Sequence, residues 1–525
     1  MIRETSGSSW SGWRPSWSAG GLLLVLLAAV ALHLPTLRGY FLGDDFGYVR
    51  LYQTLPARVF GALFFGDWSQ GIWGGQGREL RPLLALSYWA DFRLWGANPL
   101  GFRLTNLLWL VLSLAGLHRL VASRERTLSR HPAAIASVAV LVFAAHPTLP
   151  GAVDWVAGRS DLLAATAVFW SLHFLARHLE TGRATPAVLG GLAFTAGLFA
   201  KENAVLVALL APGLLGLEAA AGRVAPRRWA AVLVPVGLVC LAWVAIRFQA
   251  FGPAGGPVGA LRAGEARWVY YAEQLLRLPR LAATTVAVIA LAAVLVAAWR
   301  SGRVRGASWL FWGALWPLAA LAPAAAATYE SPRHVLLAVA GPAVVLARLA
   351  ALVWERAPRA RPVVVAAMAI VVAALGVQSA RIVGLHADMG RASHELRRLL
   401  ATAPAAQDAQ TVIVSTPRSD DAVFWDLALP FAAGPPFLDR PLDVLSGADL
   451  YCCPDWVEAS RPAFARLSGA DRPPVYRIAW DERQRRFLFS VVASRFPPGT
   501  PPPATFDEAL DWITRLAAVP RGPGN

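Results

Sequence analysis

The chain has 525 residues, of which 56% are hydrophobic and only 16% charged, and its mean hydropathy is +0.46. Soluble globular proteins carry about 25% charged residues, so this composition excludes an ordinary soluble domain and favours lipid as the solvent. A net charge of +16 would suggest nucleic-acid binding in a soluble protein, but membrane proteins collect arginine in cytoplasmic loops, and we expect no nucleic-acid partner.

Apolar stretches long enough to cross a bilayer as helices recur along the first three quarters of the chain. We therefore predict an all-α polytopic membrane protein with about 11 transmembrane helices. The first stretch lacks a small-residue cleavage site and is expected to be a retained helix rather than a signal peptide. The predicted spans are 20–37, 104–122, 133–150, 161–178, 185–200, 203–221, 229–248, 280–299, 308–327, 334–353 and 362–380.

Arginine is concentrated in the connections on one side of these spans. The arginine-rich connections are 123–131, 222–228, 300–305 and 354–361. The positive-inside rule places them in the cytoplasm, so the N-terminus is expected inside and the long segments 38–103 and 249–279 outside. We expect an integral protein of the cytoplasmic membrane of a bacterium, with its C-terminal part outside.

The last quarter of the chain has a different pattern. Strand-like runs occur at 411–415, 475–480 and 486–492, and helical patterns at 391–400 and 506–516. The predicted domains are therefore a transmembrane domain at 1–384, with a catalytic outer loop at about 38–103, and an extracytoplasmic soluble α/β domain at 385–525.

The first candidate for chemistry is the acidic pair Asp44 and Asp45, about six residues beyond the first predicted span. Two adjacent carboxylates repel each other, and one then holds its proton more tightly than usual. Such a group is suited to act as a general base toward an acceptor hydroxyl. The alternative is an exposed acidic turn, or a pair that binds a cation or an arginine. We predict no firm metal site, and leave Mg²⁺ or Mn²⁺ on these two oxygen-bearing residues open.

Lys201 is the second candidate, because it is the only lysine among 49 lysines and arginines and has long apolar runs on both sides. A charge between two membrane segments is costly and commonly functional, and an ammonium is a compact phosphate ligand. The alternative is an interfacial ion pair between Lys201 and its neighbour Glu202.

Other charged residues fall at the ends of predicted spans, where they are either membrane anchors or parts of a site. Arg333 has the planar fork that clamps a phosphate, whereas Arg159 and Asp161 are close enough in sequence to pair with each other. Candidate substrate-binding residues are Arg81, His146, Asp161 and Glu202, with Arg81 also compatible with a helix lying on the membrane surface. In the predicted topology Asp44, Asp45, Arg159, Lys201 and Arg333 all lie at the outer face.

Five stretches carry a resemblance to a known family. They are Asp44-Asp45, RPLLALSYWADFRLWGANPLGFRLTNLL (Arg81–Leu108), HPTLPGAVDWVAGRSDLLAA (His146–Ala165), FAKEN (Phe199–Asn203) and ESPRHVLLAVAGP (Glu330–Pro342). In this order they resemble the GT-C superfamily of polytopic glycosyltransferases, and within it the membrane half of the TMTC-type protein O-mannosyltransferases and their bacterial relatives.

The resemblance implies a sugar donor carried on a polyprenyl phosphate, an extracytoplasmic active site, an aspartate base at Asp44 or Asp45, and inversion at the anomeric carbon. It implies donor-phosphate binding by Lys201 and Arg333, together with Glu202. Arg159 is expected beside the same phosphate. The remaining partners are membrane lipids and an acceptor that is a protein, a glycan or a lipid.

Two departures from the family pattern bear on the acceptor. Relatives carry an acidic residue where this chain has Gly151, and the tail lacks the tetratricopeptide repeats of the TMTC type. The competing hypothesis is a transporter or lipid flippase without covalent chemistry, which predicts internal repeats and broken helices with charges in mid-span. In this chain the charges lie at the span ends. A third hypothesis is an inactive transferase fold that acts as a scaffold.

Overall fold

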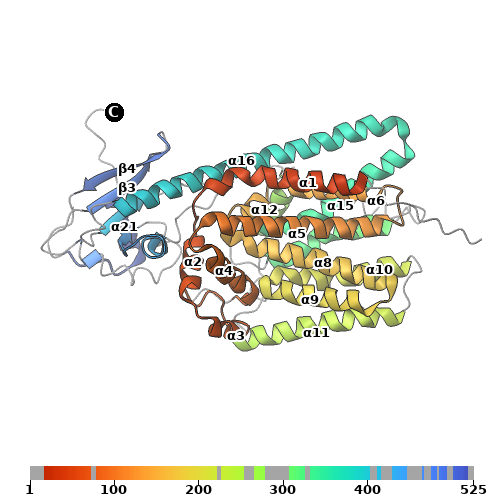
Figure 1. Cartoon of the computed structure of the whole chain (residues 1–525), viewed down its shortest axis with the longest axis horizontal. Helices are drawn as coiled ribbons and strands as arrows, with labels where there is room; N and C mark the ends of the chain where they lie inside the picture. Colours follow the sequence, from red (N-terminus) through yellow and green to blue (C-terminus); the bar gives the residue numbers. More distant parts are fainter. Residues whose placement is uncertain are drawn as a thin grey trace, which may run out of the picture.

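The computed structural model of the chain is an elongated helical bundle with a small sheet beyond one end (Figure 1). The predicted fold class, a helical membrane part with a small C-terminal α/β part, is confirmed. The described residues are 17–72, 79–220, 226–252, 265–277, 307–325, 331–402, 411–415, 429–445, 464–465, 467, 475–481, 484–492 and 500–517.

Long apolar helices form the bundle. They are α1 (Trp17–His33), α5 (Pro99–Glu125), α6 (Pro132–Ala145), α8 (Arg159–Thr181), α9 (Ala184–Ala200), α10 (Leu206–Ala220), α11 (Pro226–Phe251), α14 (Ala307–Ala325), α15 (Leu336–Arg356) and α16 (Arg361–Thr402). Each overlaps a predicted span, although α6 ends five residues earlier than predicted and α16 continues to Thr402, and the predicted span 280–299 lies outside the described residues. The exact number of spans stays a prediction.

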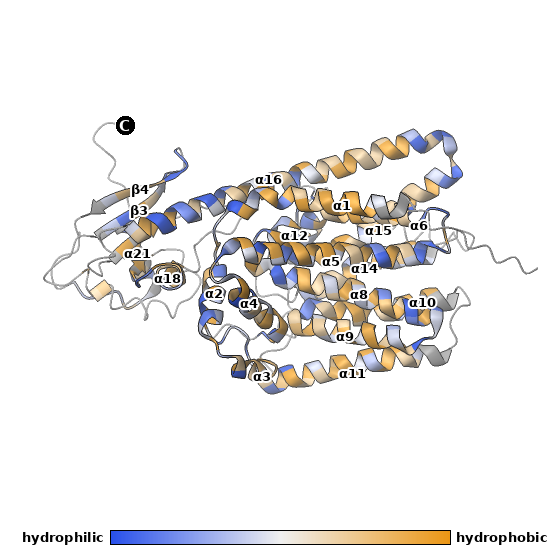
Figure 2. Cartoon of the chain, viewed as in Figure 1, coloured by the Kyte–Doolittle hydropathy of each residue, from blue (hydrophilic) through white to orange (hydrophobic). Residues whose placement is uncertain are grey.

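Six helical segments within the described part of the chain are long and apolar enough to cross a membrane, as expected of an integral membrane protein. Apolar side chains on α11 and α16, such as Leu241 and Ile370, are exposed on the outside of the bundle. Figure 2 shows the same pattern, with hydrophobic colour along the helices and hydrophilic colour at their ends. Lipid is the solvent that such a surface requires.

Short elements gather at the end of the bundle that faces the sheet, here called the Asp44 end (Figure 1). Several of them begin at a proline, which cannot donate a hydrogen bond and therefore fits the first turn of a helix. The short elements at the Asp44 end are η1 (Leu34–Arg38), α2 (Asp45–Thr54), η2 (Ala57–Val59), α3 (Phe60–Leu63), α4 (Pro82–Trp95), α7 (Pro150–Val153), η4 (Val156–Gly158), η5 (Glu202–Val205), α12 (Glu265–Leu276) and η8 (Pro332–Val335). The segments of chain that were predicted to carry chemistry are all here.

The C-terminal sheet has four strands in the order β2-β1-β3-β4. These are β1 (Thr411–Ser415), β2 (Asp443–Leu445), β3 (Val475–Asp481) and β4 (Arg486–Val492), and the helices α18 (Leu429–Ala432) and α21 (Phe506–Ala517) accompany them. β1 lies parallel to β2 and β3, whereas β3 and β4 are antiparallel. The predicted strands are confirmed, and the three-residue β2 is an addition to them.

α16 connects the two parts of the molecule. It is one helix of 42 residues, and at 1.5 Å per residue it is about 63 Å long, twice the thickness of the hydrocarbon core of a bilayer. The predicted domain boundary at residue 384 therefore falls inside a continuous helix. The division of the chain into two domains stays a prediction.

Candidate active site

The acidic pair lies in a tight turn between η1 and α2. Gly43 has φ +49°, a left-handed conformation that glycine adopts at little cost, and the helix α2 starts immediately afterwards. Asp45 is 1% exposed, and both of its carboxylate oxygens accept hydrogen bonds from backbone amides. The amide of Leu42 donates at 3.0 Å and that of Ala157 at 2.8 Å. Asp45 therefore ties the turn to η4.

Asp44 has a different environment. Its side chain is half-buried, and within the described residues no hydrogen bond to its carboxylate is present. The guanidinium of Arg333 and the carboxylate of Glu79 are close enough to act on it electrostatically. Burial raises the pKa of Asp44 to about 6, with Arg333 opposing that change and Glu79 adding to it. A carboxylate that is ionised at neutral pH, basic and accessible is what a general base requires.

Burial also raises the pKa of Asp45, to about 7, although the amides of Leu42 and Ala157 oppose the shift. Both aspartates thus titrate near neutrality, but each oxygen of Asp45 already accepts a backbone amide, whereas no hydrogen bond to the Asp44 carboxylate is present within the described residues. Groups of three or more metal-ligating side chains are not found in the described part of the chain.

Two of the predicted phosphate ligands share one acid. The ammonium of Lys201 donates to Asp161 Oδ1 at 2.6 Å, and Arg333 Nε lies 3.5 Å from Asp161 Oδ2. Lys201 stands between α9 and η5, Arg333 lies in η8, and Asp161 is in the first turn of α8. The guanidinium of Arg333 is also held over the Trp155 ring, 4.2 Å from its centroid. The fold therefore brings two cations from distant parts of the sequence to one carboxylate.

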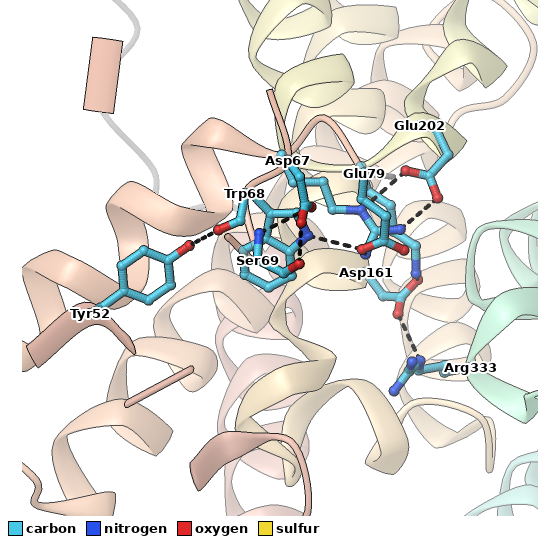
Figure 3. A network of polar contacts seen from close by, with 10 residues as sticks. Tyr52, Asp67, Trp68, Ser69, Glu79, Asp161, Glu202 and Arg333 are labelled. Carbon is cyan, nitrogen blue, oxygen red and sulfur yellow. Dashed lines mark hydrogen bonds and ion pairs between the residues drawn. The ribbon is translucent and has the colours of Figure 1, made fainter. Parts of the chain in front are cut away.

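Arg81 lies beside this cluster. It forms a bidentate pair with Glu202, with Nε–Oε2 3.1 Å and Nη2–Oε1 2.6 Å, and its Nη1 lies 2.8 Å from Glu79 Oε2. Trp68 Nε1 donates to the same oxygen of Glu79 at 2.9 Å. Figure 3 shows the two parts of this network, with Glu79 and Glu202 on one side and Asp161 and Arg333 on the other. The predicted residues Arg81, Asp161 and Glu202 therefore lie in one charged cluster with Lys201 and Arg333.

Arg159, predicted to lie beside the donor phosphate, is engaged by side chains and backbone of the bundle. It is completely buried and donates to Asn106, Ser87 and the carbonyl of Phe102. Its Nη2 also lies 2.5 Å from a carboxylate oxygen of Asp91. Because these partners occupy the guanidinium, the geometry favours a role in holding α4, α5 and α8 together over contact with a phosphate.

His146 is also engaged in packing. Its Nδ1 lies 3.0 Å from Thr148 Oγ1, and its Nε2 lies 3.0 Å from the carbonyl oxygen of Leu275. With both nitrogens bonded, the ring connects the end of α6 to α12, which favours a structural role over binding of substrate.

Sequence reasoning missed two charged members of the cluster. Glu79 interacts with Asp44, Arg81 and Trp68, and its position two residues before Arg81 was the available signal. Arg247, near the end of the apolar helix α11, interacts electrostatically with Glu202 and Arg81. A charge inside an apolar span was the signal that could have found it.

Gly151, the position of the first departure from the family pattern, lies beside Arg333. A Cβ at residue 151 would meet the Cβ of Arg333 at 3.8 Å, an ordinary contact distance. A side chain at this position would therefore begin beside the base of the Arg333 side chain. In this chain Arg333 interacts with the carboxylates of Asp161 and Asp44.

No family model matches the chain. Among curated proteins it is 30% identical over 235 residues to protein O-mannosyl-transferase Tmtc1 of Drosophila melanogaster, covering 40% of this chain and 25% of that protein. Human protein O-mannosyl-transferase TMTC2 is 28% identical over 193 residues, covering 34% and 22%. The chain resembles the TMTC-type protein O-mannosyltransferases. It spans about a quarter of the length of these TMTC-type relatives.

Two solved structures are also similar in outline. ArnT from Cupriavidus metallidurans bound to undecaprenyl phosphate is 13% identical, with a TM-score of 0.48 over 92% of this chain and all of the other. The oligosaccharyltransferase from Archaeoglobus fulgidus is 12% identical, with a TM-score of 0.45 over 77% of this chain and 62% of the other. TM-scores in this range support no argument about the site.

Proposed function

We propose that the chain is a membrane glycosyltransferase of the GT-C type, which moves a sugar from a polyprenyl-phosphate donor to an acceptor hydroxyl on the extracytoplasmic face. The observation that carries the proposal is the contrast within the acidic pair. Asp45 is committed to two backbone amides, while Asp44 keeps a half-buried carboxylate opposite Arg333. The likeness to TMTC-type O-mannosyltransferases supports the reaction class.

In the proposed reaction Asp44 accepts the proton of the acceptor hydroxyl as its oxygen attacks the anomeric carbon. The bond between that carbon and the phosphate oxygen breaks, and the polyprenyl phosphate leaves with its electron pair. Attack from the side opposite the leaving group inverts the anomeric centre. The negative charge that develops on the phosphate is the part of the transition state that nearby cations stabilise.

Lys201 and Arg333 are the cations proposed to bind that phosphate. Both are largely buried, at 4% and 8% exposed, and both are oriented by Asp161. A buried cation interacts more strongly with a phosphate than an exposed one because less water screens it. Arg81, anchored by Glu202 and Glu79, is proposed to border the donor from the other side.

The test compares membranes with and without the protein for consumption of labelled polyprenyl-phosphate sugars, followed by identification of the labelled product. We expect release of polyprenyl phosphate and covalent transfer of the sugar, both lost in Asp44→Asn. Asp439→Asn, which changes an exposed aspartate of the C-terminal part, is the matched control and should behave as wild type.

Movement of an intact labelled lipid across the membrane without a new glycosidic bond would support the flippase hypothesis instead. Full transfer activity in both Asp44→Asn and Asp45→Asn would contradict the proposal. Correct membrane insertion of each variant, checked by protease protection, separates a chemical defect from failure to fold.

A further inference from the structure

The segment that leads into the acidic pair is held by α16 along the part of that helix near the C-terminal sheet. The backbone amide of Tyr40 donates to the carbonyl of Gly390 at 2.9 Å. The hydroxyl of Ser393 donates to the carbonyl of Phe41 at 2.6 Å. These two bonds, one turn apart on α16, fix consecutive residues of the chain only a few positions before Asp44.

The two backbones approach each other so closely that only glycine fits. A Cβ at residue 390 would lie 2.8 Å from Gly39 Cα, and a Cβ at residue 39 would lie 3.1 Å from Gly390 Cα. Both distances are shorter than ordinary contacts, and the opposing atoms belong to the backbone, which cannot swing away like a side chain. The pair Gly39 and Gly390 therefore sets the separation between α16 and the segment before the acidic pair.

The C-terminal part reaches the same segment through Phe437. Its ring packs edge-on against Phe46, with ring centroids 4.9 Å apart, and against Phe41 at 5.8 Å. Arg397 of α16 donates to the carbonyl of Phe437 at 2.9 Å and lies over the Tyr40 ring at 5.3 Å. One continuous hydrophobic cluster includes Phe41 and Phe46 together with residues of β1, β3 and β4.

From this geometry we infer that the outer part of α16, from Ser379 to Thr402, acts with Phe437 as a positioning element for Asp44. The C-terminal part is then a component of the catalytic unit, because its contacts fix the segment that carries the base. Gly390, Ser393 and Phe437 are positioning residues that touch no substrate. The expected effect of these contacts on catalysis rests on the proposed function. The expected effect on the structure of the acidic segment rests on the contacts alone.

Gly390→Ala is the decisive variant, and Gly384→Ala is its matched control. Both glycines lie in α16, but a Cβ at residue 384 meets nothing within 4 Å. The two substitutions make the same change in helix propensity, so a difference between them reports the contact with Gly39. Ser393→Ala removes one hydrogen bond without adding bulk, and it is the test variant if Gly390→Ala fails to insert into the membrane.

Two measurements are made on the full chain in lipid discs. Hydrogen exchange of peptides covering residues 39–48 should be faster in Gly390→Ala and Ser393→Ala than in wild type, and unchanged in Gly384→Ala. In the transfer assay kcat should fall at least about tenfold in Gly390→Ala, as expected for a base misplaced by a fraction of an ångström. The KM for the donor should stay the same, because Lys201 and Arg333 are held by other elements.

Unchanged exchange in both Gly390→Ala and Ser393→Ala would overturn the inference. Faster exchange with an unchanged kcat would also overturn it, because the contacts would then hold the segment without positioning the base. If the wild-type protein transfers no sugar, the proposed function fails, and the exchange experiment alone decides whether α16 holds the acidic segment.

Discussion

The bundle has a buried charged cluster near each end, and the two are built differently. At the end opposite the acidic pair, Glu125 is fully buried and its two oxygens accept from Trp309 Nε1 at 3.1 Å and from Arg348 Nη1 at 3.0 Å. Each acceptor oxygen has a partner, and the carboxylate and guanidinium balance in charge. This arrangement joins α5, α14 and α15.

At the Asp44 end one carboxylate, Asp161, serves two cations, and a second carboxylate, Asp44, is half-buried with no hydrogen bond in the described structure. Lys201 and Arg333 therefore both contact the Asp161 carboxylate. A buried polar group that lacks hydrogen-bond partners lowers the stability of the folded protein. Proteins commonly keep such groups in functional sites, where a bound substrate supplies the partners. This contrast agrees with our proposal that the cluster at the Asp44 end binds the donor phosphate, whereas the Glu125 cluster stabilises the bundle.

The largest effect should come from breaking the opposite cluster. Glu125→Gln leaves the guanidinium of Arg348 buried without its charge partner, which should lower the free energy of unfolding by about 3–5 kcal/mol. The rate constant per folded molecule should be unchanged, because the cluster lies far from Asp44. Thermal unfolding in detergent and kcat normalised to folded protein measure the two quantities. A large fall in normalised kcat would contradict a purely stabilising role for the Glu125 cluster.

Lys201→Ala should lower kcat strongly and stability only a little, the reverse of Glu125→Gln. Loss of a cation that stabilises a developing phosphate charge should lower kcat by about 10²–10³-fold, with a smaller loss of stability because Arg333 still partners Asp161. Steady-state kinetics with a labelled polyprenyl-phosphate sugar measure the effect. Normal kcat in a folded Lys201→Ala protein would exclude Lys201 from the site.

The dependence of kcat on pH should follow the ionisation of Asp44. A base must be deprotonated to act, and burial raises the pKa of Asp44 to about 6. Activity should therefore be nearly constant above pH 7 and fall about tenfold per pH unit well below 6. A pH-rate profile in wild type measures this, and a profile that is flat down to pH 4.5 would contradict the assignment of Asp44 as base.

The smallest effect is expected at Trp155, whose ring supports the guanidinium of Arg333. Trp155→Leu removes the cation–π contact and should weaken donor binding by about 1 kcal/mol, or roughly fivefold in KM. Trp155→Phe keeps a ring at this position and should recover most of the loss. Equal KM values for the two variants would show that the ring does not position Arg333.

The sequence was sufficient to predict the helices of the bundle, because stretches of about 18 apolar residues are distinctive. It also indicated the acidic pair and the cluster around Lys201. It could not separate Asp44 from Asp45, because the amide that engages Asp45 belongs to Ala157, 112 residues away. The partners of Arg159, and Leu275 as a partner of His146, are likewise distant in sequence, so a single sequence could not show these contacts.

The C-terminal part shows a second limit. The strand β2 has only three residues, too few for an alternating pattern to stand out. The continuity of α16 was also missed, because its apolar half reads as a membrane span and its polar half as a separate helix. The contacts of Gly390 with Gly39 depend on tertiary packing alone, for which a single sequence holds no signal.

The central claim is that Asp44, and not Asp45, is the base of a polyprenyl-phosphate-dependent transfer. The most direct measurement is single-turnover transfer of a labelled sugar by purified wild type, Asp44→Asn and Asp45→Asn, each with saturating donor. We predict that Asp44→Asn binds the donor but transfers no sugar, while folded Asp45→Asn retains measurable transfer with reduced stability. Transfer by Asp44→Asn at the wild-type rate would contradict the claim.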